Sequence, residues 1–284
     1  MPATYLCVFL IALLGLLQCR NELTEAAGAP PPLPGWELVW ADEFDTPGPP
    51  DSSRWSYDLG DGCPHLCGWG NNELQSYTDR PRNARVENGR LIIEAHRENY
   101  QGRAYTSARL LTRERAAWRF GRFEVRAKLP SGRGTWPAVW MLPETWEYGP
   151  WPKSGEIDIM EHVGYLPDSI FGTVHTEAFN HMRGTHKTGA VHHPDVEKDF
   201  HTYALEWSPE GIVWYFEDRP YHRFDNTYDH PDEWPFDQEF HLILNLAVGG
   251  NWGGARGVDS TIWPQRFEID YVRVYRPADA PAGE

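Results

Sequence analysis

Three carboxylates stand within one short apolar run of the chain, GEIDIMEHVG. Glu156, Asp158 and Glu161 are separated there by isoleucine and methionine, which indicates a central strand that is covered on both faces. Acidic side chains in such a strand are costly unless they have a use. Crowded carboxylates cannot all ionise freely, so one of them must hold a proton. Retaining glycosidases use such a pair of carboxyl groups, at a separation of roughly 5 Å.

The spacing of the acids predicts an irregular strand. Strict alternation points Glu156 and Asp158 to one face and Glu161 to the other. A β-bulge at Ile159 and Met160 would return Glu161 to the first face, and bulges are common beside active sites. We then expect Glu156 to be the nucleophile, Glu161 the general acid/base and Asp158 the group that orients Glu156. The pattern alone does not decide between the two glutamates, and a calcium site or a merely charged strand face are the alternatives.

The composition favours an all-β fold and excludes one class of partner. The chain has 14 Trp, 26 Gly and 24 Pro, which suits short strands and turns. In GRFEVRAKL, apolar and charged residues alternate with period two, and Asn88-Gly89 marks a hairpin turn. We therefore predict an antiparallel β-sandwich of jelly-roll type with a concave substrate cleft. A net charge of −15 argues against a nucleic-acid partner and favours a neutral substrate.

The first residues of the chain predict export, and its composition predicts where the folded domain begins and ends. Residues 1–19 contain an apolar stretch typical of an export signal, and Cys19 resembles the lipid-modified cysteine of bacterial lipoproteins, so secretion and lipid anchoring both stay open. Residues 20–35 form a Pro-rich tether, residues 36–276 the folded domain and residues 277–284 a solvated tail. Cys63 and Cys67 are expected to form a disulfide in an exported chain, whereas a zinc site with His65 lacks further ligands.

The acid run resembles the ExDxxE signature of glycoside hydrolase family 16, in the bulged form of its laminarinase branch. The resemblance extends from about Trp36 to Arg276 through WELVWADEFD, GWGNNELQSYT, SGRGTWPAVWMLP, FGTVHTEAFN and FHLILNLAVGGNWGG. It implies a β-jelly-roll with an open cleft and retention of anomeric configuration. It also implies that Glu156 is the nucleophile, Asp158 the helper and Glu161 the acid/base. The expected activity is endo-hydrolysis of β-1,3-glucans such as laminarin, and also of mixed-linkage β-1,3-1,4-glucan.

The resemblance also implies residues around the acids. Sugar-binding positions are matched by Trp136, Trp140, Trp151, Asn71, Arg109 and His175. Any one of these can instead be an ordinary packing residue or a satisfied buried polar group. A structural Ca²⁺ is implied at Glu43, the Gly89 carbonyl and Asp270, with no organic cofactor.

Several alternatives accompany this interpretation. The residues His181, His186, His192 and His193 look metal-like, but their irregular spacing in a loop-like segment favours solvated histidines. Relatives of the same family that cut agar or carrageenan are the nearest rival, and a glucan-binding module without activity is the rival from another class. A serine hydrolase is disfavoured because no GxSxG occurs. We expect a monomer whose partner is a polysaccharide.

Overall fold

The computed structural model describes residues 30, 32–227 and 230–279. Contacts divide the chain into two units, Met1–Pro31 and Pro32–Glu284, and the strands found among the described residues all lie in the second. The predicted signal at residues 1–19, and most of the predicted tether and tail, lie outside the described residues. No helix in the described part of the chain is long and apolar enough to cross a membrane.

The folded unit consists of two sheets, as the alternating sequence patterns predict. Only two short 3-10 helices, η1 (Cys67–Gly70) and η2 (His181–Arg183), occur among the described residues. The ten-stranded sheet has the order β15 (Arg219–Asp225), β14 (Gly211–Phe216), β13 (His201–Ser208), β8 (Gly121–Lys128), β17 (Gln265–Pro277), β5 (Leu91–Tyr100), β6 (Arg103–Ser107) and β3 (Gln75–Tyr77), with β1 (Trp36–Asp42) on β17 and β4 (Ala84–Val86) on β5. The seven-stranded sheet has the order β12 (Lys187–His192), β11 (Ser169–His175), β10 (Glu156–Glu161), β9 (Thr135–Pro143), β16 (Phe240–Val248), β7 (Arg109–Leu111) and β2 (Ser56–Tyr57).

The strand pairings confirm the antiparallel prediction with one exception. The short strands β3 and β6 pair in parallel, whereas the other named pairs are antiparallel. The hairpin between β4 and β5 turns at Asn88 and Gly89, both with positive φ, as the Asn-Gly signal predicts. On β8, Phe123, Val125 and Ala127 are fully buried, so the period-two pattern correctly identified the core face.

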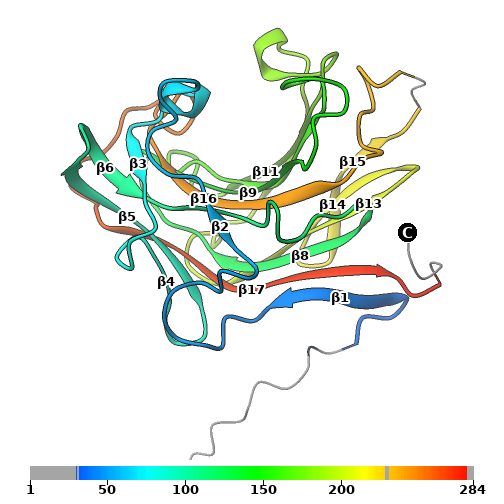
Figure 1. Cartoon of the computed structure of the whole chain (residues 1–284), viewed down its shortest axis with the longest axis horizontal. Helices are drawn as coiled ribbons and strands as arrows, with labels where there is room; N and C mark the ends of the chain where they lie inside the picture. The colour runs from blue at the N-terminus through cyan, green and yellow to red at the C-terminus, as the bar shows by residue number, and fades with distance from the viewer. Residues whose placement is uncertain (1–29, 31, 228–229, 280–284) are drawn as a thin grey trace, which may run out of the picture. The chain divides into compact units, whose positions relative to one another are not determined.

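The sheets stack face to face, and the seven-stranded sheet curves (Figure 1). Strands β9 and β16 lie above β8 and β17 in this view, with the apolar core between the two sheets. The segments that carry η1 (blue-cyan) and η2 (yellow-green) rise on opposite sides of the curved sheet (Figure 1). Strand β10 lies inside this sheet between β9 and β11, so its outward face forms the floor between the two raised segments.

Candidate active site

The acid strand contains the predicted β-bulge. Asp158 lies opposite Thr173 of β11, but the next paired residue is Glu161, opposite Phe171. On the other side, the register with β9 shifts between Asp158 and Met160. The extra residue at Ile159–Met160 therefore returns Glu161 to the face of Glu156 and Asp158, and the three acids line the same cleft.

Each glutamate of the strand is held by a tryptophan indole. Trp151 Nε1 donates to Glu156 Oε2 at 2.7 Å, and Trp136 Nε1 donates to Glu161 Oε1 at 3.1 Å. Asp158 between them is only 2% exposed, whereas the Glu156 side chain keeps 17% exposure. The two indoles fix the directions of the glutamates without neutralising their charge, because an indole N–H is a neutral donor.

Burial and mutual repulsion favour protons on these acids. Burial, followed by the charge of Asp158, raises the pKa of Glu156 to about 8. The pKa of Glu161 is raised well above its usual range, first by burial and then by Asp158. Burial also raises the pKa of Asp158, against a hydrogen bond from Glu156. A cluster of this kind retains a proton at neutral pH, which a general acid requires.

The walls of the cleft bring together most of the predicted sugar-binding residues. The lining includes Asn71, Arg109, Trp136 and Trp140. The Arg109 guanidinium lies over two indole rings, 4.8 Å from the Trp69 ring centre and 4.7 Å from that of Trp140. Flat aromatic faces beside polar groups are the surfaces that sugar rings bind.

Sequence reasoning missed a polar network in the same wall. Trp140 Nε1 donates to Asn245 Oδ1 at 2.7 Å, and Asn245 Nδ2 donates to the Tyr77 hydroxyl at 3.1 Å. That hydroxyl donates to the buried Glu73 carboxylate, whose pKa is raised by burial. Glu73 and Asn245 both line the cleft, as does Trp69. One signal was present in the sequence, since Asn245 is a lone amide in the apolar run FHLILNLAV.

His175 and Trp151 lie at the η2 side of the acids. His175 Nε2 is 3.4 Å from Asp158 Oδ2 and 3.8 Å from Glu156 Oε1. The His181 ring lies 5.3 Å from the Trp151 ring and 5.1 Å from that of His175, and His186 stacks on His175 at 5.7 Å. The sequence predicted that two of these residues, His181 and His186, would be solvated.

The expectation of a solvated histidine cluster is therefore only partly right. His181 and His192 are exposed, but His186 and His193 are half-buried. The reason is packing on other rings, since His186 stacks on His175 and the His193 ring lies 4.9 Å from that of His201. Within the described residues, none of these four belongs to a group of three metal-ligating atoms.

The residues implied for calcium make other contacts. Both Glu43 oxygens accept hydrogen bonds from Arg273 at 2.8 Å, and Arg126 Nη1 lies 2.5 Å from Asp270 Oδ2. Gly89 lies in the β4–β5 turn. Since arginines occupy these carboxylates, calcium would need a different set of oxygen atoms there or would have to displace an arginine. The calcium site stays a prediction, and no catalytic step depends on it.

The two cysteines of the domain are joined to each other. A disulfide links Cys63 and Cys67, next to η1 on one side of the cleft. The thiols are therefore not zinc ligands with His65.

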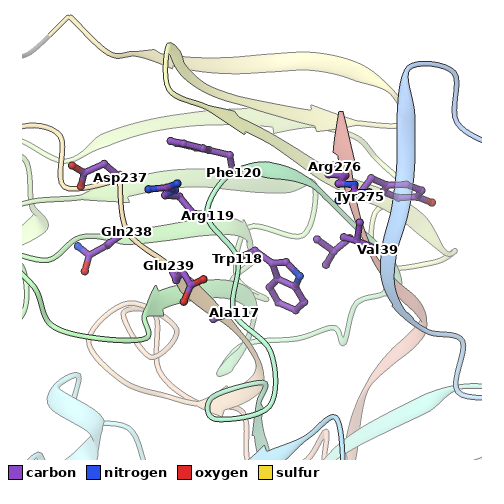
Figure 2. Close-up of a pocket in the computed structure, with 11 residues that line it drawn as sticks. Val39, Ala117, Trp118, Arg119, Phe120, Asp237, Gln238, Glu239, Tyr275 and Arg276 are labelled. Atoms are coloured by element: carbon purple, nitrogen blue, oxygen red, sulfur yellow. The ribbon is translucent and has the colours of Figure 1, made fainter. Parts of the chain in front are cut away.

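A roomier hollow elsewhere on the molecule lacks the acids. It lies beside β1, β17 and the segment before β8, and Figure 2 shows Phe120 and Trp118 among its lining side chains, with Asp237 and Glu239 at one side. None of Glu156, Asp158 and Glu161 lines it. Size alone therefore does not identify the reactive site, and the chemistry of the acid strand does.

Known proteins resemble this chain over most of its length. The model of Glycosyl hydrolases family 16 matches residues 71–273. A beta-glucanase of Rhodothermus marinus is 58% identical over 251 residues, which are 86% of this chain and 86% of that protein. The X-ray structure of the laminarinase from Rhodothermus marinus has 57% identity and a TM-score of 0.82, covering 86% of this chain and 99% of that one. A crystal structure of a non-specific endo-beta-1,3(4)-glucanase co-crystallised with 1,3-beta-D-cellotriosyl-glucose has 46% identity and a TM-score of 0.81, covering 86% and 96%.

Proposed function

Because this chain belongs to Glycosyl hydrolases family 16, we propose that it cuts internal β-1,3-glucosidic bonds of glucans such as laminarin with retention of configuration. The observation that carries the proposal is the bulge of β10, which brings three carboxylates to one face at the floor of the cleft. Two of them, Glu156 and Glu161, supply the pair of carboxyl groups that a retaining glycosidase requires.

The geometry supports a two-step displacement. The reactive form is the one in which Glu156 is ionised and Glu161 is protonated. In this form Glu156 attacks the anomeric carbon while the Glu161 carboxyl donates its proton to the departing glycosidic oxygen. A glycosyl-enzyme ester results, and Glu161 is left as a carboxylate. Glu161 then removes a proton from water, the water oxygen attacks the anomeric carbon, and the ester bond to Glu156 breaks.

Asp158 and the indoles support these roles. Asp158 lies between the two glutamates along the strand. Burial is the main cause that raises the pKa of Glu161, and the charge of Asp158 raises it further, which favours the protonated form. While Glu156 is protonated it donates a hydrogen bond to Asp158, and this contact orients the nucleophile before it ionises. Trp151 fixes Oε2 of the Glu156 carboxylate, so little reorientation is needed at the moment of attack.

Substrate range follows from the cleft walls and the relatives. The Trp69–Arg109–Trp140 stack supplies one wall for a neutral glucan chain. Activity on mixed-linkage β-1,3-1,4-glucan is part of the proposal, because a similar structure is titled a non-specific endo-beta-1,3(4)-glucanase. A binding module without chemistry would have no use for three crowded acids with raised pKa values.

The test is an activity assay on three polysaccharides. Reducing ends released from laminarin, lichenan and agarose are measured for the wild type and for Glu156→Gln, and the anomer first released from laminarin is identified by NMR. We expect β-configured ends from laminarin and a loss of about 10³-fold or more in the variant, of the size seen when a nucleophile is removed. If reducing ends are released from agarose alone, the substrate is a galactan and the proposed glucan substrate is wrong. Full activity of Glu156→Gln would exclude the proposed mechanism.

Export is a further part of the proposal. The Cys63–Cys67 disulfide is of the kind that forms in oxidising compartments, which fits the predicted signal at residues 1–19. Mass spectrometry of the protein from culture supernatant and from membranes would separate a cleaved secreted chain from one lipidated at Cys19. A chain that keeps its first residues in the cytoplasm would contradict export.

A further inference from the structure

His175 places a ring nitrogen, which can bind a metal ion, beside the carboxylate oxygens of the acid strand. It comes from β11, opposite Glu156 in the register, and is 6% exposed. Its Nε2 faces two carboxylate oxygens, Asp158 Oδ2 at 3.4 Å and Glu156 Oε1 at 3.8 Å. These three residues offer ligand atoms that all lie within 4.8 Å of one another.

These separations match the edges of a metal coordination sphere. Bonds of about 2.1 Å in a tetrahedral zinc site place two ligand atoms about 3.4 Å apart. The His175–Asp158 separation already has this value, and the His175–Glu156 separation exceeds it by a few tenths of an ångström. We propose that Glu156, Asp158 and His175 bind one divalent transition cation such as Zn²⁺ or Co²⁺ at the floor of the cleft.

Two atoms of the site are available for this. Asp158 Oδ2 is buried and has no hydrogen-bond partner within the described residues. Glu156 uses its Oε2 for Trp151, which leaves Oε1 directed towards His175. Burial raises the pKa of both carboxylates, and the charge of Asp158 raises that of Glu156 further, so a dication would compensate the buried negative charge. The fourth ligand would be water from the cleft, which the two acids line.

The donor set discriminates among cations. One imidazole nitrogen with two carboxylates suits zinc, cobalt, nickel and copper. Magnesium and calcium prefer oxygen ligands in larger number, and magnesium demands an octahedral arrangement. The site therefore separates transition cations from the alkaline-earth cations.

Binding of the cation would stop the proposed reaction. The cation occupies Glu156 Oε1, and a carboxylate that is bound to a metal is a poor nucleophile. Cation and glucan therefore compete for the same floor of the cleft. This consequence rests on the proposed function, whereas the binding itself does not.

The test measures binding directly. The full chain is titrated with Co²⁺ and followed by its visible absorption, which intensifies on tetrahedral coordination, and with Zn²⁺ by calorimetry. We expect one equivalent to bind, and His175→Gln and Asp158→Asn each to weaken it by roughly tenfold or more. His181→Gln and His186→Gln are the matched controls. Both rings contact His175, but neither histidine belongs to the group of ligand atoms formed with Glu156 and Asp158. They should leave the affinity unchanged.

The outcomes separate this proposal from its rivals. If His181→Gln or His186→Gln weakens binding as much as His175→Gln, the cation lies on the histidine rings and the proposal is wrong. Equal binding of Ca²⁺ and Zn²⁺, or an unchanged affinity in Asp158→Asn, also overturns it. Glu156→Gln serves as a second ligand variant if one of the others fails to fold. Binding as expected in a chain that cuts no glucan would contradict the proposed function alone.

Discussion

The indole nitrogen of Trp214 donates a hydrogen bond of 2.8 Å to the backbone carbonyl oxygen of Asp158. The two residues belong to different sheets, so the bond crosses the core from β14 to β10. Gly172 makes room for it, because a Cβ on Gly172 would lie 2.7 Å from the indole nitrogen. The bulge disturbs the strand register at Asp158, and Trp214 satisfies the carbonyl at that point. The position of the acids thus depends on a residue that never reaches the cleft.

Trp214→Phe is expected to lower kcat by about 10- to 100-fold with a much smaller change in KM, because the bulge loses its anchor and the acids shift. The unsatisfied carbonyl should also cost about 1–3 kcal/mol of unfolding free energy. Trp207→Phe is the matched control: Trp207 is equally buried, lies on the neighbouring strand β13 and donates to Phe236 O at 3.1 Å. It should lose stability but keep kcat. Equal losses of kcat in the two variants would show that Trp214 acts only on stability.

The sequence alone was sufficient for the floor of the site. The period-two patterns identified the strands, and the two apolar residues between Asp158 and Glu161 predicted the bulge, which the register confirms. This prediction succeeded because the direction of a side chain in a strand depends only on its position along that strand. With the spacing of Glu156, Asp158 and Glu161, one extra residue between Asp158 and Glu161 brings all three to the same face.

The supports of the site could not be predicted in this way. Trp214 and Asp158 are 56 residues apart, and their contact depends on how the two sheets stack. The Glu73–Tyr77–Asn245 network joins β16 to the segment after η1, and nothing local in the sequence says that these lie side by side. For the same reason the half-burial of His186 was missed, since it depends on the pairing of β11 with β12.

Asp158→Asn is expected to move the basic limb of the kcat/KM profile to lower pH. Burial and, after it, the charge of Asp158 raise the pKa of Glu161, so removal of that charge lets Glu161 lose its proton at a lower pH. The enzyme then lacks its general acid over a pH range in which the wild type still has it. The measurement is the pH profile on laminarin. Glu73→Gln, which removes a carboxylate from the cleft wall, is the control. A basic limb that stays in place, or moves to higher pH, contradicts the role of Asp158.

Arg109→Lys is expected to raise KM for laminarin by about 3- to 10-fold with less effect on kcat, because a lysine cannot stack as a plane between Trp69 and Trp140. Arg113→Lys is the matched control. Both arginines contact Asp58, at 3.2 and 3.3 Å, but only Arg109 lines the cleft. Steady-state kinetics of both variants decide the matter. If the two changes raise KM equally, the effect comes from the ion pair with Asp58 and not from the aromatic stack.

Glu156→Gln should stabilise the fold at alkaline pH. The pKa of Glu156 is about 8 in the folded chain, above the usual value near 4.5, so the folded state holds a proton that the unfolded state has lost. Stability from this group is complete below pH ~4.5 and is lost as pH rises through about 8. The variant escapes this loss, so its Tm should exceed that of the wild type at pH 9 but not at pH 4.5, by about 2–4 °C for each kcal/mol.

The exposed residue Glu210 provides the opposite case. Its pKa is lowered by a hydrogen bond from the Ser208 hydroxyl, so it contributes stability above its usual pKa and loses it as pH falls. Glu210→Gln should therefore lower Tm slightly at pH 9 and leave it unchanged in acid. Differential scanning calorimetry of both variants across this range gives the comparison. The Tm difference between Glu156→Gln and the wild type should grow with pH. If it does not, the ionised Glu156 does not destabilise the fold, and burial does not raise the pKa of the nucleophile.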